Sequence, residues 1–479
     1  MARSFAYGVL PRHSQGVDEE LRKIYQGLDL ALRVGEVVLA SGAGAADTTA
    51  SMLAVTEAVG FRGCETDVSF TSLSVSYQPS PDDPPETRMR RVYHREFDYS
   101  RLTAVDHLVR DLVAGTINQD EARKRLDTYV STGRPIPRWA STLGWGVMAA
   151  GVALLMGGTW VVMVVAFLAT MLIDYLNRQL GRRRIPVFYQ QVLGGFVATM
   201  AAVGMQALSD TLEFDFLASA NSSQVVAAAI IVLLSGMGIV GAVQDALTGF
   251  YVTAAARSFE VVLLTGGIIG GVTGGLVLVS RFDVSLVVAP TDPRGIDYLP
   301  LAVLGAAITA SAFVFASYAP FRTILPAALM GILGQVVYRA VVETGVGVAW
   351  GSALAAVLVG VTAFSVAGRM RVPPLVVVVS GIVPLLPGMS IYRGLYQMFD
   401  PESSTGAFLG MTSLVTAATI AVALAAGVIL GEYVAQPLKR EARRLETRLA
   451  GPRLVGPLRI KRSRRSRRRG PAPEGSGPT

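Results

Sequence analysis

Polar side chains that interrupt long apolar segments are the residues of this 479-residue sequence best suited to chemistry. Gln244, Asp245 and Thr248 close one apolar segment, and Arg257 and Glu260 open the next. Residues three apart share a helical face, so Asp245 lies with Thr248 and Arg257 with Glu260. Polar groups are costly in hydrocarbon and often mark ion or substrate pathways. Arg257 and Glu260 therefore form either a structural ion pair or part of a substrate and proton path.

Proton transfer within the apolar segments would depend on carboxyl groups. The three histidines, His13, His94 and His107, all precede these segments. A carboxylate that binds protons near neutral pH needs a pKa that is raised by burial or by a neighbouring negative charge. Asp245 and Glu260 are therefore the leading candidates for a proton-carrying residue.

Prolines interrupt the apolar segment 373–393. Pro384, Pro387 and Gly388 disrupt helical hydrogen bonding there, and Tyr392 and Arg393 follow them. At membrane depth such a break is tolerated only where the freed backbone groups face protein or water. In transporters, broken helices offer N–H groups to anions and C=O groups to cations. The pattern predicts either a site for a zwitterion or a simple proline kink.

Two further segments carry patterned residues. Gln335 and Arg339 lie four apart on one helical face, where Arg339 either extends toward the outer interface or forms a gate or substrate contact. The segment 258–280 carries two ridges of glycines at spacing four, which let a neighbouring helix approach closely or slide during transport. The ridges are Gly266, Gly270 and Gly274, and Gly267, Gly271 and Gly275.

Enzyme signatures are absent from the sequence. It contains no G-x-S-x-G elbow, H-E-x-x-H helix or Walker A loop. The single cysteine, Cys64, can build neither an intramolecular disulfide nor a metal cluster. We therefore expect no metal and no cofactor, and a chain that moves a solute without an ATP site must use an ion gradient or run downhill.

Composition predicts an all-α polytopic membrane protein. Apolar residues make up 51% of the chain and charged residues 16%, against about 25% charged in a soluble protein. Ten apolar runs are long enough to cross about 30 Å of hydrocarbon. They are residues 139–157, 159–177, 187–208, 224–243, 258–280, 299–317, 323–341, 347–367, 373–393 and 407–431.

The distribution of basic residues predicts the orientation of these spans. Lys and Arg favour the cytoplasmic side of a membrane. Basic residues follow the even-numbered runs, as at 182–184, Arg257, Arg322 and Arg369, and a basic tail follows the tenth. We therefore expect ten spans in a bacterial inner membrane, with both termini in the cytoplasm.

The chain is expected to have six parts. Residues 17–135 read as an N-terminal α+β cytoplasmic domain, in which Asp47 is expected to cap the second helix. The basic tail holds 14 Lys or Arg against 3 Asp or Glu from Lys439 onward, which favours anionic lipid over nucleic acid as its partner. The parts are a tail at 1–16, the domain at 17–135, a five-helix half at 136–280, a loop at 281–298, a second five-helix half at 299–435, and a disordered basic tail at 436–479.

Five separated motifs resemble the threonine/serine exporter family. They occur in the family's order, and the resemblance covers about residues 18–435, in the single-chain form seen in actinobacteria. The loop around Pro290–Asp297 and the basic tail lie outside it. The motifs are residues 32–42, 66–74, 192–199, 244–249 with 252–260, and 373–394.

The resemblance implies a secondary transporter that exports threonine and serine by proton antiport. We expect alternating access, with a substrate site near the broken ninth segment. A homo-oligomer is compatible with this assignment. Some relatives are associated with dicarboxylate export, and a dicarboxylate would need two cationic contacts, which Arg257, Arg339 and Arg393 offer. A third interpretation is a membrane-bound sensor or hydrolase, but Ser41 and Asp47 of the N-terminal domain lack a partner base at recognisable spacing.

Overall fold

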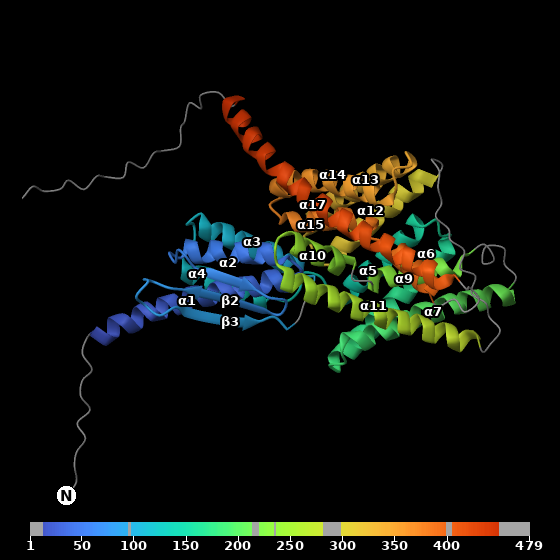
Figure 1. The fold of residues 1–479 in the computed structure, drawn as a ribbon, viewed down its shortest axis with the longest axis horizontal. Coiled ribbons are helices and arrows are strands. Elements are labelled where there is room, and N and C mark those ends of the chain that lie inside the picture. Colours follow the sequence, from blue (N-terminus) through green and yellow to red (C-terminus); the bar gives the residue numbers. More distant parts are fainter. Residues whose placement is uncertain are drawn as a thin grey trace, which may run out of the picture. The chain divides into compact units, whose positions relative to one another are not determined.

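The computed structural model describes residues 13–93, 97–212, 220–233, 236–280, 298–398 and 405–449 (Figure 1). The chain divides into two compact units, Met1–Ala435 and Gln436–Thr479. The first unit contains both the N-terminal domain and the apolar helices. Residues 1–12 of the predicted N-terminal tail, 281–297 of the predicted loop and 450–479 of the basic tail lie outside the described residues.

The described part of the N-terminal domain has four helices and a small sheet, and the first two helices pack against the sheet. The strands pair antiparallel in the order β1-β2-β3, with Val68 opposite Leu73 and Leu73 opposite Arg90. Leu28 and Leu39 of the first helix are completely buried, in the core cluster that also contains Leu73 of the sheet. The elements are α1 (His13–Ala40), α2 (Ala45–Ala58), β1 (Glu65–Val68), β2 (Ser72–Tyr77), β3 (Glu86–Arg91), α3 (Tyr99–Val113) and α4 (Gln119–Ser131).

Helix caps in this domain differ in part from the prediction. The Asn118 side chain caps α4 by accepting a hydrogen bond from the Glu121 N–H at 2.9 Å. The prediction that Asp47 caps α2 is wrong, because Gly44 occupies the N-cap position in extended conformation and Asp47 lies in the first turn. This position leaves the Asp47 carboxylate available to contacts outside its own helix.

Apolar helices make up the rest of the first unit. Seven helices of the described residues are long and apolar enough to cross a membrane, or eight if the pair α9 and α10, bent by 47°, is one span. The helices are α5 (Arg138–Leu155), α6 (Trp160–Arg182), α7 (Val187–Leu212), α9 (Ser222–Leu233), α10 (Gly236–Leu247), α11 (Tyr251–Ser280), α12 (Leu299–Ala316), α13 (Ile324–Glu343), α14 (Val348–Met370), α15 (Pro374–Ile382), α16 (Gly388–Met398) and α17 (Gly406–Leu449).

The predicted count of ten spans is not confirmed. The first predicted run is α5, an 18-residue helix that begins with Arg138 and carries several small or polar residues in its first half. The ninth is divided between α15, which has nine residues, and α16. For these two segments, membrane crossing stays a prediction.

The two glycine ridges of α11 have different surroundings. A Cβ added at Gly267 would lie 2.9 Å from the Phe188 carbonyl oxygen of α7, and one at Gly271 only 2.0 Å from the Val192 carbonyl oxygen. A Cβ added at Gly266, Gly270 or Gly274 would meet nothing within 4 Å. One ridge therefore brings the backbones of α7 and α11 together, and the other faces open space in this chain.

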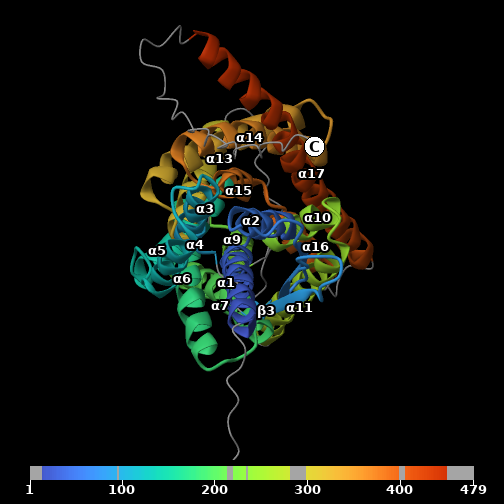
Figure 2. The ribbon, with the colours of Figure 1, turned by 90° about the vertical axis from the view of Figure 1, so that its left-hand side faces the viewer.

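The N-terminal domain and the apolar helices share one hydrophobic core. The core cluster that contains Leu28 and Leu73 continues through Tyr99 to Phe313 of α12 and Val376 of α15. Aromatic rings of Phe97, Tyr99 and Trp145 surround Phe313 at centroid distances of 6.3, 6.1 and 6.0 Å. Figure 2 shows α2 among α3, α10 and α15. The domain is thus built into the helical body rather than tethered beside it.

Candidate functional site

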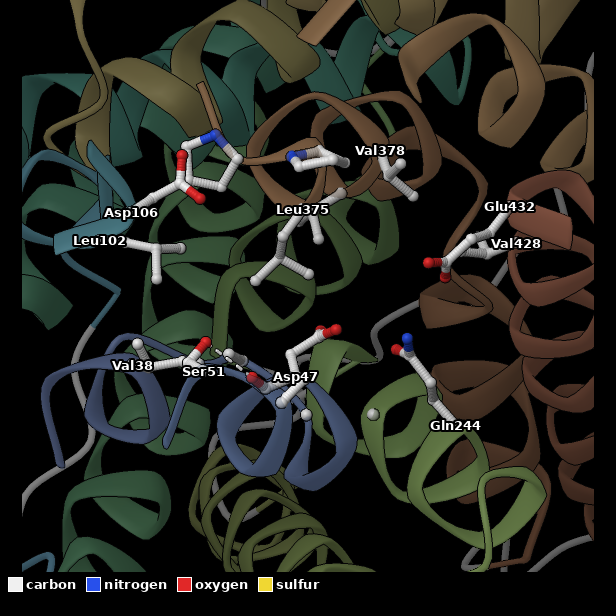
Figure 3. Close-up of a pocket in the computed structure, with 18 of the residues that line it drawn as sticks. Val38, Asp47, Ser51, Leu102, Asp106, Gln244, Leu375, Val378, Val428 and Glu432 are labelled. Atoms are coloured by element: carbon white, nitrogen blue, oxygen red, sulfur yellow. Dashed lines mark hydrogen bonds between the residues drawn. The ribbon is translucent and has the colours of Figure 1, made fainter. Parts of the chain in front are cut away.

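A cavity of about 360 Å³ lies between the N-terminal domain and five helices of the apolar region (Figure 3). Its volume falls in the range of small-molecule sites, roughly 300–1,000 Å³. Helices α1, α2 and α3 form one wall, and α10, α11, α14, α15 and α17 form the rest. The polar lining residues are Asp47, Ser51, Asp106, Gln244, Arg257 and Glu432, and the apolar ones include Val38, Leu102, Leu375, Val378 and Val428.

The helical segments meet here at the ends predicted to face the cytoplasm. Gln244 belongs to the last turns of α10, and Arg257 follows the first turns of α11. The turn between them is short because Gly249 adopts a φ of +92°, which a side chain would strain, and the Phe250 N–H bonds back to the Asp245 carbonyl at 2.9 Å. The hairpin places position 245 beside position 257.

An ion pair lies directly behind the cavity wall. Arg257 Nη1 is 2.9 Å from Asp245 Oδ2, and the two side chains are only 8% and 1% exposed. The guanidinium lies over Gly241, where an added Cβ would come within 2.7 Å of Nη1. Buried charges are tolerated when they are paired and hydrogen-bonded, and glycine at 241 makes room for this pair.

Asp245 also binds the N-terminal domain. Its Oδ1 accepts a hydrogen bond of 2.9 Å from the Ala45 N–H, 200 residues away in the sequence. Ala45 is the first residue of α2, and the first N–H groups of a helix lack intrahelical partners. A carboxylate at this position also interacts favourably with the helix dipole. Asp245 thus performs the capping role that the sequence had suggested for Asp47.

Carboxylates from three elements face the cavity. Figure 3 shows Asp47 extending from α2 beneath Leu375, with Gln244 and Glu432 on one side and Asp106 on the other. Burial raises the pKa of Asp47, and the negative charge of Asp245 raises it further. Burial also raises the pKa of Asp106, while Arg110, 2.8 Å away, opposes that shift.

The predicted break in the ninth segment is present but lies beyond the cavity. Helix α15 ends at Ile382, a short 3-10 turn spans Val383–Leu385, and α16 begins at Gly388. The lining includes Pro373, Pro374 and Leu375 and stops at Ile382. The first half of the segment therefore forms the cavity, and Pro384 and Pro387 are buried behind it.

Several predicted site residues lie elsewhere. Among the described lining residues, only Gln244 and Arg257 come from the set predicted to bind substrate or protons. Arg339 interacts electrostatically with Tyr298, whose hydroxyl donates a hydrogen bond to the Leu154 carbonyl. Leu154 lies at the C-terminal end of α5, and Tyr298 directly precedes α12. Asp245, which pairs with Arg257, is also outside the lining, and so are Thr248, Glu260, Gln335, Pro384, Pro387, Gly388 and Arg393; the Tyr392 side chain is outside the described set.

Comparison with known proteins decides the family. The family model described as "Putative threonine/serine exporter" matches residues 29–279, and the model described as "Threonine/Serine exporter, ThrE" matches residues 302–434. The chain belongs to the threonine/serine exporter family. It is 37% identical to a probable threonine/serine exporter of Mycobacterium tuberculosis over 450 residues, which are 92% of this chain and 82% of that protein. It is 34% identical to a threonine/serine exporter of Corynebacterium glutamicum over 423 residues, 87% of this chain and 84% of that protein.

Membership in the threonine/serine exporter family makes the chain a membrane transporter and not an enzyme. No solved structure matches the chain. The Ser41 hydroxyl is buried and donates to the Val37 carbonyl within its own helix at 2.7 Å, so it is not available as a nucleophile. Within the described residues, no group of three or more His, Cys, Asp or Glu could hold a metal ion.

Sequence reasoning missed three carboxylates of this exporter-family cavity. Asp47 had been assigned to a helix cap, and Asp106 lies on an amphipathic helix among other charged residues. Glu432 lies at the end of a long apolar run and gave no signal of its own. These residues are 59 to 385 positions apart in the sequence, and the docking of the N-terminal domain brings Asp47 and Asp106 to Glu432.

Proposed function

We propose that this chain exports threonine and serine from the bacterial cytoplasm across the inner membrane, in exchange for protons and by alternating access. Both termini would lie in the cytoplasm. Family membership supports the substrate class, because the relatives in Mycobacterium tuberculosis and Corynebacterium glutamicum carry that description. In this orientation the cavity lies at the cytoplasmic ends of α10, α14 and α17, where a substrate for export would enter.

The charged residues that line the cavity are the observation that supports an amino acid as the substrate. The described lining has three carboxylates, Asp47, Asp106 and Glu432, and one guanidinium, Arg257; Asp245 pairs with Arg257, and Arg110 pairs with Asp106. A dicarboxylate carries two negative charges and would be repelled by this lining. A zwitterionic amino acid brings an ammonium group that the lining attracts. The arrangement therefore favours amino acids over the dicarboxylate alternative.

Counterflow in proteoliposomes tests the substrate class. Purified protein is reconstituted into vesicles loaded with unlabelled threonine, and uptake of labelled threonine is followed with external threonine, serine or succinate as competitor. We expect threonine and serine to compete and succinate not to. Competition by succinate alone would replace this proposal with dicarboxylate export.

The proton component has its own test. An acidic vesicle interior should drive threonine uptake above equilibration, and a protonophore should abolish the excess. Asp245 and Glu260 remain the proposed proton carriers; Asp245 lies in the last turn of α10, and Glu260 lies within α11. If Asp245→Asn and Glu260→Gln both retain protonophore-sensitive uptake, neither residue carries the proton. Uptake that only equilibrates, with or without the gradient, would indicate export without proton coupling.

A further inference from the structure

The N-terminal domain contributes a charged side chain to the cavity. Asp47 lies in the first turn of α2, and its side chain is accessible from the cavity. Among the described residues, the Asp47 carbonyl accepts a hydrogen bond from the Ser51 hydroxyl at 2.8 Å, and the negative charge of Asp245 repels the Asp47 carboxylate. Its carboxylate oxygens thus have no donor from the described residues.

The surroundings of Asp47 do not explain a structural role for this carboxylate. An aspartate in a first helical turn is stabilised by free N–H groups and by the helix dipole. Here the capping hydrogen bond to the Ala45 N–H comes from Asp245 instead, so two carboxylates lie at one helix N-terminus. Replacing Asp47 with a neutral residue would relieve repulsion. A charge at such a position is explained better by a ligand than by folding.

The opposite wall can recognise the other end of an amino acid. Gln244 offers two N–H donors and a carbonyl oxygen, and a guanidinium carries five N–H donors, of which the pair with Asp245 uses a subset. These groups suit a carboxylate and a side-chain hydroxyl. Asp47, from another domain, faces the same space (Figure 3).

We propose that Asp47 binds the ammonium group of the transported amino acid, so that the N-terminal domain forms part of the substrate site. This inference rests on the proposed export of threonine and serine. The ammonium group would replace the missing donor at Asp47, and Gln244 with Arg257 would receive the carboxylate. The soluble domain would then act in substrate selection at the cytoplasmic side.

Binding and counterflow measurements on the full-length protein test this role. The variants are Asp47→Asn, Asp47→Glu and Asp83→Asn, the last a matched loss of one carboxylate at an exposed loop residue. Loss of a charge-assisted hydrogen bond should weaken threonine binding by about 10- to 100-fold in Asp47→Asn. Asp47→Glu should recover part of the affinity, and Asp83→Asn should bind as the wild type does.

A ligand without the ammonium group separates recognition from folding. 3-Hydroxybutanoate is threonine without its amino group, so its competition should differ by less than about twofold between the wild type and Asp47→Asn. An equal loss for both ligands would overturn the inference, as would unchanged threonine affinity in Asp47→Asn. If 3-hydroxybutanoate does not compete with threonine for binding to either protein, the role of Asp47 is judged from the threonine affinities and from the recovery in Asp47→Glu. If the wild type shows no threonine counterflow, the proposed export itself is refuted. If the wild type exchanges threonine and the Asp47→Asn variant does so equally well, only the role of Asp47 is refuted.

Discussion

At the scale of single residues, Asp245 links the two parts of the molecule. It pairs with Arg257 across the α10–α11 hairpin and caps α2 of the N-terminal domain. The sequence identified both members of this pair by their position in apolar segments, but it grouped Arg257 with Glu260 by helical spacing. The short turn at Gly249 gives Arg257 a partner on the preceding helix instead. Helical spacing alone cannot anticipate that contact.

Breaking this ion pair should be costly. In Asp245→Asn, Arg257 keeps a buried charge without its counter-ion, and loss of one partner of such a pair typically costs about 3–5 kcal/mol. The double variant Asp245→Asn with Arg257→Gln removes both charges and should recover part of that stability. Thermal unfolding of the four purified proteins gives the coupling energy. Additive effects in the double variant would contradict a direct interaction.

Loss of the Asp47 charge should stabilise the folded protein at neutral pH, whereas loss of the Asp245 charge should destabilise it. The raised pKa of Asp47 means that the charged form is disfavoured in the folded protein, so the penalty is absent below the unfolded pKa, grows between the unfolded and the folded pKa, and is complete above the folded pKa. The charged groups around it are Asp245, Arg257, Asp106 and Glu432.

The Asp47→Asn variant should therefore unfold at a higher temperature than the wild type at about pH 7.5, and the difference should shrink toward about pH 4.5. Thermal unfolding of both proteins across this range measures it, with Asp83→Asn as the control for an exposed carboxylate. A lower unfolding temperature at pH 7.5 would mean that the Asp47 charge stabilises the fold.

At the scale of elements, the α7–α11 contact depends on one glycine ridge and not on the other. Gly271→Ala would place a Cβ 2.0 Å from the Val192 carbonyl oxygen, which belongs to backbone and cannot rotate away. Gly270→Ala meets nothing within 4 Å and serves as the matched control. We expect Gly271→Ala to destabilise the protein by about 1–3 kcal/mol, as overpacking does. Gly270→Ala should be neutral or slightly stabilising because alanine favours helix. Equal unfolding temperatures for the two variants would contradict this helix contact.

Elements were predictable where one local pattern decides them. Apolar runs placed the helices, and Pro384 and Pro387 placed the break in the ninth segment, because both signals act within a few residues. The glycine spacing predicted close helix contact but could not tell which ridge faces α7. The prediction for the N-cap of α2 failed for a related reason, because the capping carboxylate belongs to Asp245, outside the N-terminal domain.

At the scale of the whole molecule, the candidate site belongs to neither part alone. Composition separates a soluble domain at residues 17–135 from the apolar helices, and that division suggests an independent module. The structure joins them through a common core, through Ala45 bonded to Asp245, and through Thr253, whose hydroxyl donates to the Val68 carbonyl at 2.9 Å. Sequence patterns are local, so they identified Gln244 and Arg257 but not Asp47 and Asp106, which line the opposite side of the cavity.

Removal of the N-terminal domain should therefore damage the membrane part. A chain that begins at residue 136 would expose Phe313, Val376 and Val379, which are buried in the shared core, and would leave Asp245 without its α2 contact. Exposed apolar patches of this kind promote association. We expect the truncated chain to insert but to elute as aggregates in detergent on size-exclusion chromatography, and to unfold at a lower temperature than the full chain. Its natural control is a chain that lacks only residues 450–479, which should elute and unfold as the full-length protein does. A monodisperse truncated chain with full threonine counterflow would show that the domain is dispensable for transport, and would also remove Asp47 from the substrate site.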